Sequence, residues 1–152
     1  MLHEWLHRPH VAEWWGEPET LADLHEYCRQ LTAPDGRDRA YIVMERGTPI
    51  GYIQSYVVKD GGEGWWPDEQ DAGARGIDQF IADETRLGRG VGTALIRAFV
   101  DRLFDDPGVT VVQTDPDPRN ARAIRCYEKA GFRAAREVVT PDGAALLMVR
   151  RR

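Results

Sequence analysis

The chain has 152 residues, of which 20 are basic and 25 acidic, so its formal net charge is −5. This length allows one substantial core and is too short for two ordinary domains, so we expect a single domain over residues 1–152. The acidic balance argues against nucleic acid as a partner, and the lack of a long apolar run argues against a membrane span. Residues 1–5 lack the pattern of a signal peptide, so we expect a cytoplasmic protein.

Cysteine and histidine usage does not indicate a metal site. Cys28 and Cys126 are far apart, and although they could in principle pair, we expect buried free thiols in a reducing compartment. The histidines lack the clustered spacing of zinc ligands, so no metal is expected, and surface roles are predicted for all four: His3, His7, His10 and His25.

The first half of the chain predicts helices followed by strands. Residues 2–8 and 18–31 have helical spacing, and the second segment places Leu21, Leu24 and Cys28 along one face. A turn is predicted at 33–36. Residues 41–45 and 50–58 then predict a hairpin, which is followed by a glycine-rich loop at 60–64 and a short strand at 76–81.

The second half opens with three glycines within five residues, Gly88-Arg89-Gly90-Val91-Gly92. They let the backbone approach a ligand, and the helix predicted at 93–104 adds its positive N-terminal end, so the turn suits a pyrophosphate. The spacing fits neither the Rossmann dinucleotide motif nor a Gly-Lys-Ser/Thr phosphate loop. A short strand at 109–112, a helix from Asn120 and a hairpin formed by 132–139 and 144–149 follow, which indicates an α/β fold with a mixed, mainly antiparallel sheet flanked by helices.

The segment 88–132 resembles the acetyl-coenzyme A site of the GNAT superfamily of N-acetyltransferases, whose turn reads Gln/Arg-x-x-Gly-x-Gly/Ala. Gly90 and Gly92 fit the two small positions, whereas Leu87 stands where Gln or Arg is commonest. The resemblance implies a GNAT fold with a twisted sheet and acetyl-coenzyme A as co-substrate. It implies cofactor contacts from Gly88, Arg89, Gly90, Val91, Gly92, Thr93 and from Asn120, which is also expected to cap the helix that follows it.

A closer resemblance is to the aminoglycoside 6'-N-acetyltransferases. It rests on blocks throughout the chain, namely Glu4-Trp5-Leu6, Glu13-Trp14-Trp15, residues 49–56, Gly64-Trp65-Trp66, residues 75–79, Gln113-Thr114-Asp115-Pro116 and residues 120–132. The resemblance implies an acyltransferase that acetylates the 6'-amine of these antibiotics by direct transfer in a ternary complex and so confers resistance. Those enzymes carry a strand and a turn ahead of the residues that match 1–6, and we expect this chain to lack them. The sheet edge exposed in this way is one that a second chain could cover, so a monomer or a homodimer is expected.

The same resemblance assigns the two catalytic roles. Asp78 matches the aspartate that acts as base or holds the amine, and Tyr127 matches the tyrosine that reprotonates the leaving thiolate. From the residues alone, Tyr127 could equally be a packing residue. Cys126 as a covalent nucleophile is disfavoured, because no base stands beside it.

A polycationic aminoglycoside would need carboxylates and aromatic faces around it. Adjacent tryptophans in a polar loop are hard to bury together, so at least one of them is expected to line a substrate cleft, whereas Glu69 and Asp71 are expected in a solvated loop. The predicted substrate-binding residues are Gln54, Glu63, Trp65, Trp66, Asp78 and Asp115.

Two other functions remain open at this point. The N-terminal blocks and residues 120–132 also resemble acyltransferases of siderophore assembly that act on hydroxylysine or hydroxyornithine. A non-catalytic module that binds acyl-coenzyme A is the alternative from another class, although the presence of both Asp78 and Tyr127 disfavours it.

Overall fold

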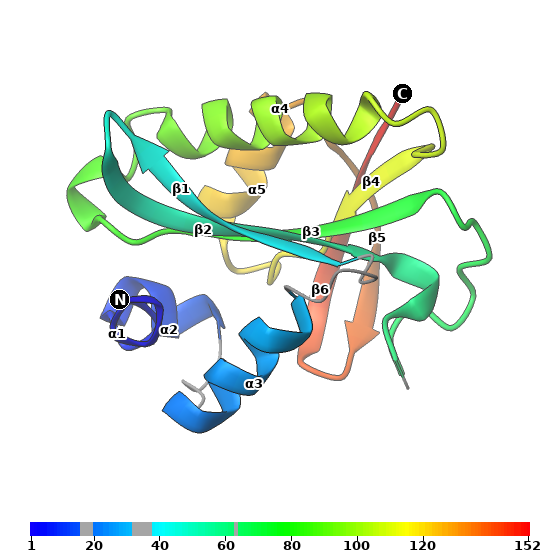
Figure 1. Cartoon of the computed structure of the whole chain (residues 1–152). Helices are drawn as coiled ribbons and strands as arrows, with labels where there is room; N and C mark the ends of the chain where they lie inside the picture. Colours follow the sequence, from blue (N-terminus) through cyan, green and yellow to red (C-terminus); the bar gives the residue numbers. More distant parts are fainter. Residues whose placement is uncertain (16–19, 32–37, 63) are drawn as a thin grey trace. The chain divides into compact units, whose positions relative to one another are not determined.

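A computed structural model describes residues 1–15, 20–31, 38–62 and 64–152 of the chain. Six strands form one sheet in the order β1-β2-β3-β4-β6-β5 (Figure 1). The β1–β2, β4–β6 and β5–β6 pairs are antiparallel, and the β3–β4 pair is parallel. The prediction of a mixed, mainly antiparallel sheet flanked by helices is therefore confirmed.

The described residues form two compact units. The first unit consists of Met1–Ser55 and Asp78–Leu87, and the second consists of Tyr56–Ile77 and Gly88–Arg152. Strands β2 (Thr48–Val57) and β3 (Ala74–Ile81) each contribute residues to both units. The expectation of a single domain over residues 1–152 stays a prediction.

Three short helices begin the first unit. They are α1 (Leu2–Leu6), α2 (Pro9–Trp15) and α3 (Leu21–Leu31), and they lie on one side of strands β1 (Arg39–Glu45) and β2 (Figure 1). The predicted end of the first helix at residue 8 is wrong, because α1 ends at Leu6 and a second helix begins at Pro9. Proline is tolerated as the first residue of a helix, because the backbone N–H that it lacks would have no helical partner there. The predicted start of α3 at 18 and the predicted turn at 33–36 fall on residues outside the described ranges.

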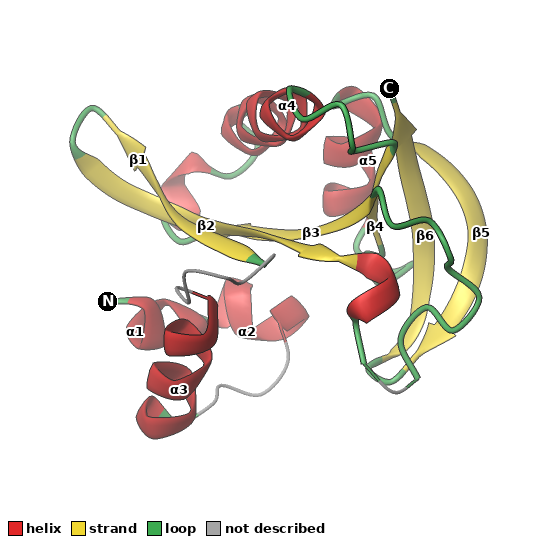
Figure 2. Cartoon of the chain, turned by 45° about the vertical axis from the view of Figure 1, so that its right-hand side comes forward, coloured by secondary structure: helices red, strands yellow, loops and turns green. Residues whose placement is uncertain are grey.

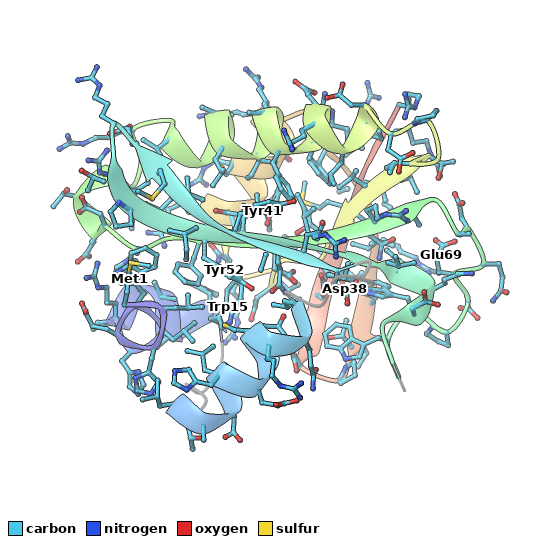
Figure 3. All side chains as sticks on the ribbon, in the orientation of Figure 1. Met1, Trp15, Asp38, Tyr41, Tyr52 and Glu69 are labelled. Atoms are coloured by element: carbon cyan, nitrogen blue, oxygen red, sulfur yellow. The ribbon has the colours of Figure 1, made fainter. Side chains whose placement is uncertain are left out.

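Aromatic rings make the core of the first unit. Phe80 on β3 stacks on Tyr52 of β2 with ring centroids 5.6 Å apart and meets Trp15 and Trp5 edge-on at 4.9 and 6.4 Å. Tyr52 and Trp15 lie together on the helix side of β2, whereas Tyr41 of β1 lies on the other side (Figure 3). Trp5 and Trp15 are therefore packing residues of this core.

Polar contacts hold the first two helices to the end of β3. The Arg8 guanidinium donates to the carbonyl of Ala82 at 2.7 Å, and His10 Nε2 lies 3.1 Å from the carbonyl oxygen of Ile81. His10 thus has a structural contact that the expectation of a surface role did not include. On β2, a Cβ added to Gly51 would lie 2.4 Å from the Phe80 carbonyl oxygen, so only glycine fits there without a backbone shift.

The second unit contains the remaining elements close to where the sequence predicts them. They are α4 (Val91–Phe104), β4 (Val111–Thr114), α5 (Ala121–Lys129), β5 (Arg133–Thr140) and β6 (Gly143–Arg151). Helices α4 and α5 are neighbours, and β5 and β6 form a long curved hairpin whose outer strand β5 ends the sheet (Figure 2).

Two predictions about individual residues need correction. Asp71 is not simply solvated: its carboxylate accepts hydrogen bonds from the Gly73 N–H and the Thr110 hydroxyl, and the Thr110 bond, followed by the Gly73 bond, lowers the pKa of Asp71. These bonds fix the loop before β3 to the segment before β4. Cys28 and Cys126 are free thiols as expected, but both are half-buried rather than buried.

Candidate active site

Asp78 lies on β3 in the first unit, where its side chain is half-buried. Gln54 Nε2 donates to Asp78 Oδ2 at 2.8 Å, so the structure brings together two of the residues predicted to bind substrate. Asp78 and Phe80 are two residues apart on β3, so their side chains point to the same face of the strand. Asp78 therefore lies on the face that carries the aromatic core. A carboxylate beside apolar rings needs a polar partner, and Gln54 provides one.

Two tyrosines complete this arrangement, and sequence reasoning assigned neither of them a role. The hydroxyls of Tyr27 on α3 and Tyr52 on β2 both donate to Gln54 Oε1, at 2.7 and 2.6 Å. Burial raises the pKa of Tyr52, and the negative charge of Asp78 adds to the rise, so its phenol stays protonated as a donor. Tyr52 and Gln54 are two residues apart on one strand, which signals a shared face, but Tyr27 carries no sequence signal of this contact.

The glycine turn and the start of α4 lie in the second unit. Gly88 and Gly90 have φ of 72° and 83°, a left-handed conformation that favours glycine. Gly90 is the N-cap of α4, makes no side-chain cap, and its carbonyl accepts the first helical bond, from the Ala94 N–H at 3.0 Å. An α-helix leaves its first N–H groups without helical partners, so residues 91–93 present donors at the positive end of a 14-residue helix.

This turn fits an anionic phosphate group. Gly88, Arg89 and Gly90 are exposed, and Val91, Gly92 and Thr93 are half-buried, so the backbone donors lie at the surface. Gly92 sits close to α5, because a Cβ there would lie 3.2 Å from Cys126 Sγ, and Thr93 Oγ1 lies 3.3 Å from the same sulfur. Contact with Gly92 and Thr93 explains why Cys126 is half-buried, without any role as a nucleophile.

Helix α5 carries Asn120 and Tyr127. Asn120 Oδ1 accepts from the Ala123 N–H at 3.0 Å, which confirms the predicted helix cap. Tyr127 is 4% exposed and packs edge-on against Phe132, with ring centroids 5.4 Å apart. The packing half of its two possible roles is therefore observed, and its acid role stays a prediction, as does the contact of Asn120 with the cofactor.

The predicted substrate residues of the second unit lie around β4 and the loop before β3. Trp65 and Trp66 are both half-buried, with ring centroids 6.2 Å apart, and Trp66 has φ of 47° and packs against the cluster of Val58, Ala74 and Val111. They lie in the loop before β3, and the expectation that at least one of them lines a substrate cleft stays a prediction. Asp115 is half-buried just after β4, and Glu63 lies outside the described residues.

Two buried hydrogen-bond donors in the second unit lack a partner among the described residues. They are Nε1 of Trp66 and Nε2 of Gln113, whose side chain is 4% exposed on β4. A buried donor without an acceptor is costly, so a ligand oxygen is one group that would satisfy it. In the sequence, Gln113 is noted only as part of the block Gln113-Thr114-Asp115-Pro116. Nothing in that block predicts a buried amide donor without a partner.

Comparison with known proteins identifies the family. A model of the acetyltransferase (GNAT) domain matches residues 1–140. The chain belongs to the GNAT acetyltransferases. It is 54% identical to the aminoglycoside N(6')-acetyltransferase type 1 of Klebsiella pneumoniae, in an alignment that covers 100% of this chain and 77% of that protein.

Other GNAT relatives support the assignment at the level of structure and sequence. The crystal structure of aminoglycoside acetyltransferase AAC(6')-Ib in complex with coenzyme A and kanamycin matches with a TM-score of 0.93 and 53% identity, covering 100% of this chain and 88% of that one. A lysine N-acyltransferase of Mycobacterium sp. (strain MCS) is 33% identical over 86% of this chain and 53% of that protein. The resemblance to GNAT acyltransferases read from the sequence is thus confirmed.

Within the residues that the structure describes, no group of three or more His, Cys, Asp or Glu side chains is arranged to hold a metal ion. None of the helices in that part of the chain is long and apolar enough to span a bilayer.

Proposed function

We propose that this GNAT acetyltransferase transfers an acetyl group from acetyl-coenzyme A to the 6'-amine of aminoglycoside antibiotics and so confers resistance to them. The observation that carries the proposal is the 54% identity, over the whole chain, to an aminoglycoside N(6')-acetyltransferase. The substrate-facing chemistry agrees with it, because the chain offers a carboxylate, Asp78, held ready by an amide donor.

The co-substrate is held by the glycine turn and the start of α4. Backbone N–H groups of residues 91–93 and the positive end of the helix bind the pyrophosphate, and Gly88 and Gly90 let the backbone approach it. Acetyl-coenzyme A supplies an activated thioester, so that a C–N bond to the amine forms as the C–S bond breaks.

Side chains of the protein carry out the two proton transfers of the reaction. The 6'-ammonium must lose a proton before it is a nucleophile, and Asp78 orients it and accepts that proton directly or through water. Tyr127 donates a proton to the departing thiolate. Both substrates are bound together, so the transfer is direct and Cys126 does not carry the acetyl group.

The remaining cations and hydroxyls of the aminoglycoside meet the other substrate residues. Asp115 and Glu63 attract ammonium groups, and the indoles of Trp65 and Trp66 cover the apolar faces of the sugar rings. Nε1 of Trp66 and Nε2 of Gln113, which have no partner among the described residues, donate hydrogen bonds to sugar hydroxyl oxygens. We place the reaction in the cytoplasm and expect a monomer or a homodimer.

The test is thiol release from acetyl-coenzyme A by the purified protein with separate amines. The arms are kanamycin, an aminoglycoside with a hydroxyl in place of the 6'-amine, lysine and hydroxylysine. Turnover restricted to kanamycin, the compound with a free 6'-amine, supports the proposal. Turnover on lysine or hydroxylysine alone indicates siderophore-type acylation instead. The 33% identity to a lysine N-acyltransferase favours this second candidate. Binding of coenzyme A with no turnover on any amine indicates the non-catalytic module.

A further inference from the structure

The side-chain amide of Gln54 makes three hydrogen bonds to residues from three different elements of the first unit. Its oxygen accepts from the hydroxyls of Tyr27 on α3 (2.7 Å) and Tyr52 on β2 (2.6 Å), and its nitrogen donates to Asp78 on β3 (2.8 Å). A carboxamide oxygen has two lone pairs, so the two phenols saturate it. The amide is therefore held from both ends.

Only one orientation of this amide satisfies all its neighbours. An ionised carboxylate accepts hydrogen bonds and donates none, so the NH₂ group must face Asp78 and the oxygen must face the phenols. The flipped amide would bring its oxygen against the Asp78 carboxylate, and two acceptors would then face each other in a half-buried site. The Asp78 carboxylate therefore excludes the flip, and the tyrosine hydroxyls, which donate to the amide oxygen, hold the amide in the remaining orientation.

Tyr52 is well suited to this task because its ring is enclosed by other aromatic rings. It is 4% exposed, stacks on Phe80 and meets Trp15 edge-on at 5.8 Å. Tyr27 approaches the same oxygen from α3, whose apolar face packs against the aromatic core. The two hydroxyls therefore hold the Gln54 amide from its own strand β2 and from helix α3.

We propose that Tyr27 and Tyr52 are positioning residues of the acetyl transfer: they fix the amide of Gln54 so that its NH₂ holds the Asp78 carboxylate ionised and in place to receive the substrate ammonium. A hydrogen bond from a neutral donor favours the ionised form of a carboxylate and sets the direction of its oxygen. This inference rests on the proposed function, since it concerns the residue assigned there to the amine proton.

The first test uses a substitution cycle. Gln54→Met removes the donor at similar size, and we expect kcat to fall roughly 10- to 100-fold with little change in KM for acetyl-coenzyme A, because a hydrogen bond to a charged group is lost. Tyr27→Phe and Tyr52→Phe should each lower kcat roughly two- to tenfold. In the Gln54→Met background the same two substitutions should have no further effect on kcat, because there is no amide left to orient.

The matched control is Tyr41→Phe, which removes a hydroxyl from an exposed tyrosine on the opposite side of the β1–β2 ribbon (Figure 3). We expect its kcat to stay within about twofold of the parent protein. Additive losses from the tyrosine substitutions in the Gln54→Met background would overturn the inference, and so would losses confined to thermal stability with kcat unchanged. If the parent protein acetylates no aminoglycoside, the proposed function fails instead, and that result is read before any variant is made.

A second measurement does not depend on turnover. The titration midpoint of the Asp78 carboxyl, followed by its ¹³C resonance, should move to higher pH in the Tyr27→Phe/Tyr52→Phe double variant and in Gln54→Met. The titratable groups around this network are Tyr27 and Cys28 on α3 and Tyr52 on β2. Phenols and thiols are uncharged in the acidic range where carboxyl groups titrate. A shift in the Asp78 midpoint therefore reports the loss of the amide hydrogen bond. An unchanged midpoint in both variants would overturn the inference.

Discussion

The ring of Phe80 makes three aromatic contacts, and its removal should strongly destabilise the first unit. Phe80 is 8% exposed and contacts Tyr52, Trp15 and Trp5. Truncation of a buried phenylalanine to alanine costs about 3–5 kcal/mol of unfolding free energy. Each favourable ring pair contributes about 0.5–1.5 kcal/mol beyond the buried area, so Phe80→Ala belongs near the upper end of that range.

Urea denaturation followed by tryptophan fluorescence measures this loss. With an m value of about 2 kcal/mol/M, a loss of 4 kcal/mol moves the midpoint by about 2 M. Phe80→Leu keeps most of the volume and loses the ring pairs, so its loss should be intermediate, at roughly 1–3 kcal/mol. Val139→Ala, at an 87% exposed position on β5, is the control and should stay within about 0.5 kcal/mol. A Phe80→Ala loss no larger than that of the control would refute the reasoning.

Other substitutions test separate parts of the site. Gly90→Ala places a Cβ in a left-handed conformation that costs about 1–2 kcal/mol, so the free turn should relax and must return to the strained form to bind acetyl-coenzyme A. KM for acetyl-coenzyme A should then rise roughly 5- to 30-fold in steady-state kinetics, with little change in KM for the amine, and an unchanged KM for acetyl-coenzyme A would contradict the phosphate role of the turn. Tyr127→Phe should lower kcat about 10-fold or more with thermal stability kept, and equal kcat in both proteins would return Tyr127 to packing alone. Trp66→Ala should weaken aminoglycoside binding in calorimetry by roughly 10-fold, and unaltered affinity would remove this indole from the substrate cleft. Tyr52→Phe tests pH dependence, because burial raises the folded-state pKa of the Tyr52 phenol above its value in the unfolded chain. The stability that this hydroxyl contributes is therefore complete below about pH 10. Above that pH it falls by at most about 1.4 kcal/mol per pH unit. The difference in unfolding free energy between the parent and Tyr52→Phe should therefore shrink from pH 10 to 11, and a constant difference would contradict the raised pKa.

Local signals in the sequence predicted most of the fold. Asn120 marks the start of α5 because an N-cap acts on an N–H three residues away, within reach of sequence reasoning. The glycine turn was found for a similar reason, since left-handed residues next to a helix start are a local requirement. Pro9 was the exception, because proline reads equally well as the end of one helix and as the first residue of the next.

The contacts that assemble the site were beyond such signals. Asp78 came from a family resemblance, and its bond to Gln54 joins residues 24 positions apart. Tyr27 lies 27 positions from Gln54 on a helix whose register against the sheet depends on packing of the whole aromatic core. Asp71 and Thr110 are 39 positions apart, so a carboxylate read as solvated proved to hold two segments together. Each of these pairs depends on tertiary structure and not on spacing.

The outer strand β5 determines whether another chain can add to this edge of the sheet. An edge strand exposes unpaired backbone groups to which a second chain could add, and this is a common route to aggregation. Strand β5 carries Arg133, Arg136 and Glu137 as exposed side chains, and its register against β6 is interrupted between Ala134 and Arg136. Charge and irregularity on this edge hinder the addition of another strand, so the sheet can end at β5 without recruiting a second chain there.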